Sequence, residues 1–102
     1  MLDSLTSADF VPRLQEAFWL SYEPSAPAVE VELIEVTDLG DPPPAGYPIR
    51  RRPFSLVFRA PRTCHLPQRI YTLENHTLGQ LDLFLVPIGP DSRGMCYEAV
   101  FT

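Results

Sequence analysis

The chain has 102 residues, of which 45% are hydrophobic and 11% aromatic. This composition argues against disorder and predicts one globular domain over residues 1–102. The net charge is −5, from 13 acidic and 8 basic residues, which argues against general nucleic-acid binding because such binding neutralises phosphates. No apolar run is as long as a membrane span and no basic secretory signal begins the chain. We therefore expect no membrane span, a cytoplasmic location and two free thiols, at Cys64 and Cys96.

Residues 1–15 are predicted to form a short helical segment. Thr6 is a helix-capping residue and Asp9 follows three positions later, as in a capping box, with Phe10 at a hydrophobic staple position. Pro12 disfavours a helical conformation in the residue before it, so the helix should end after one or two turns. We expect its apolar residues to plug one end or one face of a sheet.

Six short strands follow, each apolar or alternating and bounded by Gly, Pro, Asn or Asp. They are predicted at 18–22, 29–38, 53–60, 69–74, 80–89 and 95–101. In the second strand the alternation slips by one residue, which predicts a β-bulge near Leu33 and Ile34. Glu30 and Glu32 share one face of that strand, and we interpret them as outward residues rather than catalytic carboxylates. Six strands and a short helix predict an all-β fold, a small antiparallel barrel or sandwich.

Residues 39–53 are predicted to form a loop rich in proline and arginine. Three consecutive prolines favour an extended segment, and long loops of this kind are often functional or mobile. The loop carries the arginine triplet Arg50, Arg51 and Arg52. These arginines either contact an acidic partner surface or a phosphate, or they are solvated and balance the acidic strand at 30–38. The second interpretation is favoured, because charge runs are usually solvated.

The fifth strand is apolar on both faces. One face has Leu81, Leu83 and Leu85, and the other has Phe84, Val86 and Ile88. An antiparallel sheet normally keeps one face wet, so this strand needs cover on both sides. Either the chain's own Phe10, Trp19 and Tyr47 supply the cover, which their availability favours, or another molecule does. Phe84, Val86 and Ile88 are therefore candidate interaction residues, together with Arg50–Arg52.

Residues 95–101 are a second candidate contact element if they lie at a sheet edge, because open edges recruit strands. A ligand-binding alternative places an apolar pocket between Trp19, Tyr71 and Phe84, with an arginine at its mouth.

Cysteine and histidine supply two further alternatives. Cys64, His65, His76 and Cys96 are potential zinc ligands, but their spacing is not that of structural zinc sites, so no metal or cofactor is expected. Cys64 or Cys96 with His76 as a base is the enzymatic alternative. Lone cysteines in a small β domain are usually packing residues, and we expect no enzymatic activity.

Four stretches resemble one family of short bacterial proteins, an uncharacterised domain of unknown function. They are MLDSLTSADF at 1–10, PFSLVF at 53–58, YTLENH at 71–76 and LDLFLVPIGP at 81–90. The resemblance covers the whole chain and implies no catalytic residues. It also implies an association with phage-tail-collar-like proteins, and hence an accessory or structural part of a tail-like or fibre assembly. We therefore expect a non-enzymatic structural or interaction module that self-associates or docks to a larger assembly.

Overall fold

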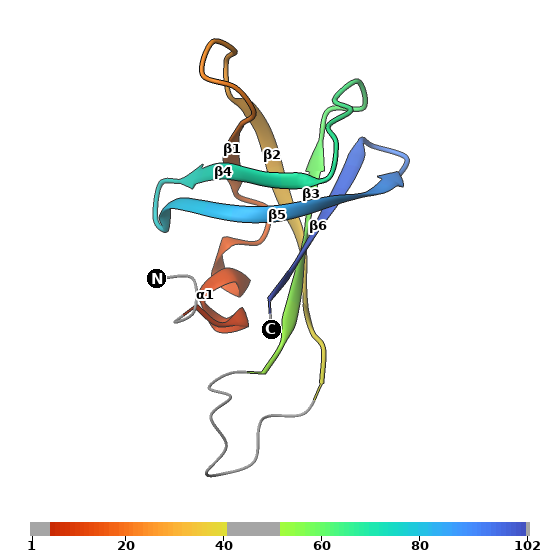
Figure 1. Cartoon of the computed structure of the whole chain (residues 1–102). Helices are drawn as coiled ribbons and strands as arrows, with labels where there is room; N and C mark the ends of the chain where they lie inside the picture. Colours follow the sequence, from red (N-terminus) through yellow and green to blue (C-terminus); the bar gives the residue numbers. More distant parts are fainter. Residues whose placement is uncertain (1–4, 41–51, 102) are drawn as a thin grey trace.

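The computed structural model describes residues 5–40 and 52–101. In order, the elements are α1 Ser7–Phe10, η2 Val11–Arg13, β1 Ala17–Ser21, β2 Val29–Asp38, β3 Phe54–Ala60, β4 Arg69–Asn75, β5 Gly79–Pro90 and β6 Met95–Phe101. The strands form one closed antiparallel barrel (Figure 1). The predicted all-β class with a short N-terminal helix is confirmed, and the barrel is selected over the sandwich. Each strand begins and ends within one residue of its predicted position.

The barrel closes in the order β1-β2-β3-β6-β5-β4, and β5 is the strand that changes partner. Its residues up to Leu85 pair with β4, and those from Val86 onward pair with β6. β4 and β5 consequently cross in front of the ribbon made by β2, β3 and β6 (Figure 1). The register shifts between Pro87 and Gly89, and Gly89 has a φ of 108°. Such a bulge bends a strand, and here it lies within the part of β5 that pairs with β6.

β6 is not an edge strand. All seven of its residues pair with β3, and those through Glu98 also pair with β5. The condition under which residues 95–101 would recruit another strand is therefore not met over Met95–Glu98, while residues 99–101 pair with β3 alone. The reason is the length of β5, whose final residues reach across and close the barrel on β6.

The interior of the barrel is filled by large side chains. The inward residues of all six strands contribute to one buried cluster, which includes Phe18, Phe58, Tyr71 and Tyr97. The rings of Phe18 and Phe58 meet edge-on with their centroids 5.1 Å apart, an arrangement that aromatic pairs prefer.

The N-terminal segment plugs one end of the barrel, as predicted. Asp9 Oδ2 accepts a hydrogen bond from the backbone N–H of Thr6 at 2.7 Å, which fixes the start of α1. Phe10 is fully buried and its ring centroid lies 5.8 Å from Phe54 and 5.6 Å from Phe101. The expectation that Phe10 covers the outer face of β5 is wrong, because the barrel interior offers this ring more complete burial.

The predicted bulge in β2 is confirmed, since the register with β3 shifts between Leu33 and Glu35. A second bulge lies on the other side of the same strand. Leu33 O accepts a hydrogen bond from Gln15 N at 2.7 Å, and Leu33 N donates to Glu16 O at 3.2 Å. Gln15 and Glu16 thus lie opposite the single residue Leu33, and Gln15 has a positive φ of 70°.

Candidate functional site

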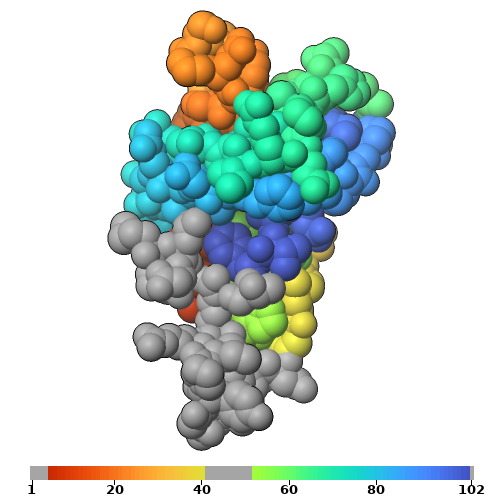
Figure 2. Space-filling model, viewed as in Figure 1, coloured from red at the N-terminus to blue at the C-terminus, as the bar shows by residue number. Residues whose placement is uncertain are grey.

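An exposed apolar patch lies on the outer face of β4 and β5. Ile70 on β4 is directly opposite Phe84 on β5, and their exposed fractions are 65% and 49%. Val86 is half-buried and Ile88 is about half-exposed further along β5. We call Ile70, Phe84, Val86 and Ile88 the outer patch. Figure 2 shows β4 and β5 as a continuous band across this side of the molecule.

The inward residues hold the outer patch outside the barrel. Leu81, Leu83 and Leu85 are buried in the core, and side chains alternate between the two faces of a strand. Moving Phe84 inward would require a one-residue slip that exposes all three leucines. The cover expected from Trp19 is not seen either, because the register places Trp19 beside Glu74, at the end of β4 away from Ile70. Tyr47, the remaining predicted cover, lies outside the described residues.

The size of the outer patch limits what it can do. With about 200 Å² for each large side chain, its half-exposed residues present roughly 300 Å² of apolar surface. Patches of this size on monomers are often functional. A stable protein interface, however, buries about 800 Å² on each partner. The outer patch is therefore sufficient for a weak contact, and a strong one needs neighbouring surface as well.

The face of β4 and β5 is divided into an apolar end and a polar end. Next to the outer patch, Thr72 Oγ1 donates a hydrogen bond to Asp82 Oδ1 at 2.7 Å across the two strands. Beyond this pair Glu74 is opposite Gln80, and both are exposed. Carboxylates are thus concentrated at the end of the face nearest the β4–β5 turn.

Of the three arginines predicted to contact a partner, Arg52 is among the described residues. Its Nη1 lies 3.4 Å from Asp38 Oδ2 at the end of β2, and both side chains are exposed. Arg50 and Arg51 lie outside the described residues. The pair agrees with the interpretation in which the arginine balances the acidic strand, although an exposed ion pair contributes only about 0–1 kcal/mol to stability.

The four cysteine and histidine side chains do not gather at one place, although Cys64 and His65 are neighbours in the chain. Cys96 pairs with Gly89 near the end of β5, whereas His76 lies in the turn before the start of that strand. Cys64 is in the loop between β3 and β4. Burial is the main cause that raises the pKa of both thiols, which is opposite to the activation of a nucleophilic cysteine. In the described part of the chain, no three His, Cys, Asp or Glu side chains gather as metal ligands.

Trp19, Tyr71 and Phe84 do not share a pocket. Tyr71 points into the barrel and is 2% exposed, while the other two side chains are on the outer surface. The Tyr71 hydroxyl donates a hydrogen bond to the carbonyl of Pro67 at 2.5 Å. The three residues of the ligand-binding alternative therefore lie on opposite sides of the barrel wall.

An ion-pair network connects the β5–β6 hairpin to β3. Asp91 Oδ2 accepts hydrogen bonds from Nε and Nη2 of Arg59, at 2.9 and 2.5 Å. Asp91 Oδ1 accepts the backbone N–H groups of Arg93 and Gly94, both at 2.8 Å. The Arg59 guanidinium is the main cause that holds the pKa of Asp91 well below its usual range, and the two backbone N–H groups add to it. Arg59 also lies 3.9 Å from Glu32 on β2.

Two of these features escaped the sequence analysis. Alternation along the strand places Ile70 on the face opposite Tyr71, but the sequence does not give the register that places it beside Phe84. Arg59 and Asp91 are 32 residues apart, so nothing local connects them. The Asp-Ser-Arg-Gly order of the hairpin loop was the available signal, because Asp at that position caps its own turn.

No helix among the described residues is long and apolar enough to cross a membrane. One protein-family model, described as Domain of unknown function (DUF6916), matches residues 5–101. No curated protein and no solved structure matches the chain.

Proposed function

The chain belongs to the DUF6916 family, a domain of unknown function, and we propose that it is a non-enzymatic interaction module that self-associates through the outer patch. The observation that carries this proposal is the pairing of half-exposed Ile70 and Phe84 on a rigid sheet face. Burying such a pair against an identical surface removes apolar area from water, which is favourable by about 25 cal/mol per Å².

The division of the face into two ends favours a two-fold arrangement of copies. In a symmetric dimer the same patch meets itself, and sheets pack face to face. Two copies that overlap at their apolar ends keep Glu74 and Asp82 of each copy at opposite ends of the contact. Like charges are then kept apart. The small area makes the association weak and dependent on concentration.

We propose further that the module acts in the cytoplasm as an accessory or structural part of a phage-tail-like or fibre assembly. Both cysteines are free, which suits a reducing compartment. The assembly itself is supported by the resemblance in sequence. A weak contact also suits a repeated structure, because linked copies bind far more strongly than single ones.

Light scattering over a concentration series tests self-association. We expect the mass of the wild-type protein to rise with concentration, and the Phe84→Glu variant to remain a folded monomer. Val11→Glu is the matched control, because Val11 is an exposed aliphatic residue on η2, away from the outer patch. It should associate as the wild type does.

Circular dichroism must show that both variants keep the fold. A wild-type protein that remains monomeric up to millimolar concentration would overturn the proposal. So would a Phe84→Glu variant that associates as strongly as the wild type.

A further inference from the structure

β3 ends too early to cover the whole of β2. The pairing of these two strands starts with Glu32 opposite Arg59, and β3 ends at Ala60. In the same register Glu30 would be opposite Pro61. Proline has no backbone N–H, so it cannot donate the next hydrogen bond of the ladder. The chain turns away at this point, where Pro61 O accepts a hydrogen bond from Cys64 N at 2.9 Å.

The backbone of Glu30 is directed to this uncovered edge. Leu33 exchanges its hydrogen bonds with the segment leading into β1, and in an antiparallel ladder alternate residues bond to the same neighbour. Val31 therefore bonds toward β1, whereas Glu30 and Glu32 direct their N–H and C=O groups to the opposite side. Glu32 meets Arg59 there. In the described part of the chain, the register pairs Glu30 with Trp19 of β1 alone.

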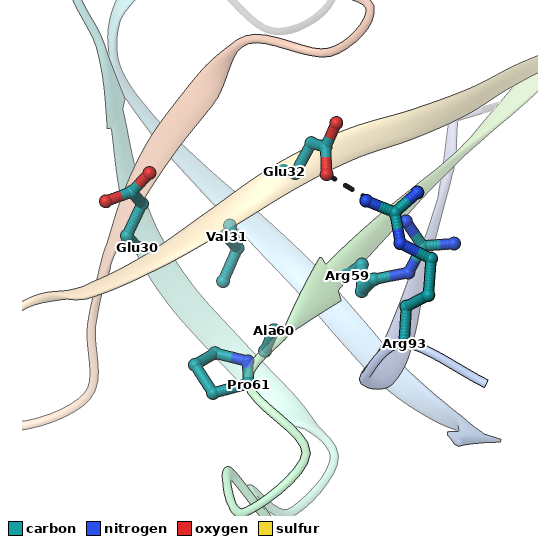
Figure 3. A pocket seen from close by; sticks show the side chains of 7 residues that line it. All are labelled: Glu30, Val31, Glu32, Arg59, Ala60, Pro61 and Arg93. Atoms are coloured by element: carbon teal, nitrogen blue, oxygen red, sulfur yellow. Dashed lines mark ion pairs between the residues drawn. The ribbon is translucent and has the colours of Figure 1, made fainter. Parts of the chain in front are cut away.

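A hollow of about 330 Å³ lies along this edge (Figure 3). It is lined by Glu30, Val31, Glu32, Arg59, Ala60, Pro61 and Arg93. In Figure 3, Glu30 lies at one side of the hollow, Arg59 and Arg93 lie together at the other, and Glu32 forms its ion pair with Arg59. A second hollow, of about 390 Å³, adjoins the first at Pro61, and Tyr22, Val29 and Leu66 are among its lining residues. Both volumes are in the range of ligand sites.

The charges at the two ends of the first hollow are available to a ligand. Among the described residues, neither the Glu30 carboxylate nor the Arg93 guanidinium takes part in an ion pair. Arg93 is held in place by its neighbours: Asp91 accepts its backbone N–H, and Gly94 packs so closely on Ala60 that a Cβ atom there would collide with the Ala60 carbonyl oxygen. The hollow therefore has an anionic end at Glu30 and a cationic end at Arg93, where the backbone is fixed.

We call the uncovered edge of β2 at Glu30, together with the hollow beside it, the seam. We propose that the seam binds an extended peptide of a partner protein, which adds a strand to the edge of β2 at Glu30. The peptide exchanges backbone hydrogen bonds with Glu30, places a basic side chain beside the Glu30 carboxylate and an acidic side chain within reach of Arg93, and extends over the second hollow beyond Pro61. Strand addition of this kind draws affinity from the backbone and specificity from side chains. A second copy fits less well, because its own β2 edge would set Glu30 against Glu30, and like charges directly opposite are destabilising.

Blocked six-residue peptides of threonine and valine test the proposal. Each carries one arginine and one glutamate, in either order and up to two residues apart. We expect at least one peptide to slow hydrogen exchange of the Glu30 amide by about tenfold or more, measured by NMR. Methylation of the backbone nitrogen of its arginine should abolish binding, because the rung with Glu30 needs that N–H.

Pro61→Val provides the matching change in the protein. Valine supplies the missing N–H, so β3 can extend by one residue and close the seam, and peptide binding should be lost. Pro12→Val, a change at an exposed proline of η2 away from the seam, should leave binding intact. Phe84→Glu should also leave it intact, which separates this site from the outer patch.

Three results would overturn the proposal. One is a rate of hydrogen exchange at the Glu30 amide that no peptide changes at millimolar concentration. Another is binding that survives Pro61→Val or methylation of the peptide. The third is protection of the Glu30 amide without peptide that rises with protein concentration, because a second copy would then occupy the edge.

Discussion

Gln15 adopts a backbone conformation that residues with a side chain rarely take, with a φ of 70°. It is the first residue of the bulge opposite Leu33, a position that glycine favours. The left-handed conformation costs an L-residue roughly 1–2 kcal/mol, while glycine loses about 0.5–1 kcal/mol of backbone entropy in exchange. Two hydrogen bonds, which join Leu33 to Gln15 and Glu16, fix the turn from η2 into β1. They stabilise the strained conformation of Gln15.

In a strand, valine usually gives a more stable protein than glycine. At position 15 we expect the opposite order. We expect Gln15→Gly to leave the free energy of unfolding unchanged or to raise it by up to about 1 kcal/mol. Gln15→Val should lower it by about 1–2 kcal/mol, because a branched Cβ is poorly tolerated at positive φ. Denaturation in urea measures both. Gln80, exposed within β5, is the matched control, and there valine should be the more stable substitution. The same order at both positions would contradict the prediction.

Asp91 should make stability sensitive to acid. Its pKa is depressed in the folded protein, chiefly by Arg59, so its stabilising contribution is complete above the unfolded value near ~4 and is lost as the pH falls toward the folded pKa. We expect Asp91→Asn to be less stable than the wild type at neutral pH, and to lose less stability between about pH 4 and pH 2. Urea unfolding across this range measures the slope. Arg59→Gln should flatten the slope in part, because the backbone N–H groups of Arg93 and Gly94 still lower the pKa of Asp91. A wild-type slope in either variant would show that the pair is not its cause.

At the scale of elements, α1 depends on one side chain. A helix of four residues is too short to be stable by itself, so the packing of Phe10 against Phe54 and Phe101 must hold it. We expect Phe10→Ala to lower the free energy of unfolding by about 3–5 kcal/mol. Val11→Ala, at an exposed neighbour, should change it by no more than about 0.5 kcal/mol. Thermal and urea unfolding compare the two, and a small loss in Phe10→Ala would show that the barrel end is closed without the ring.

The strands themselves were predictable because period-two alternation is a local property. The same alternation located the bulge near Leu33 and the two-sided character of β5. The burial site of Phe10 was not predictable, since it depends on how far apart the barrel walls lie. Pro61 was visible as a strand terminator, but its effect on Glu30 depends on the register between β2 and β3. That register is set by the whole barrel, so the seam could not be inferred from the chain alone.

At the scale of the whole molecule, charge opposes the proposed self-association. Each copy carries a net charge of −5, and the contact itself is apolar. Raising the salt concentration from about 0.1 M to about 1 M shortens the Debye length from ~10 Å to ~3 Å. Repulsion between two acidic copies is then screened, while the burial of Ile70 and Phe84 is not weakened.

We therefore expect the average mass in light scattering to rise with sodium chloride at constant protein concentration. Phe84→Glu should remain a monomer at both salt concentrations, because screening cannot replace the lost apolar contact. A wild-type mass that falls as salt is added would point to a contact held by ion pairs. In that case Arg50, Arg51 and Arg52, and not the outer patch, would be the residues to substitute next.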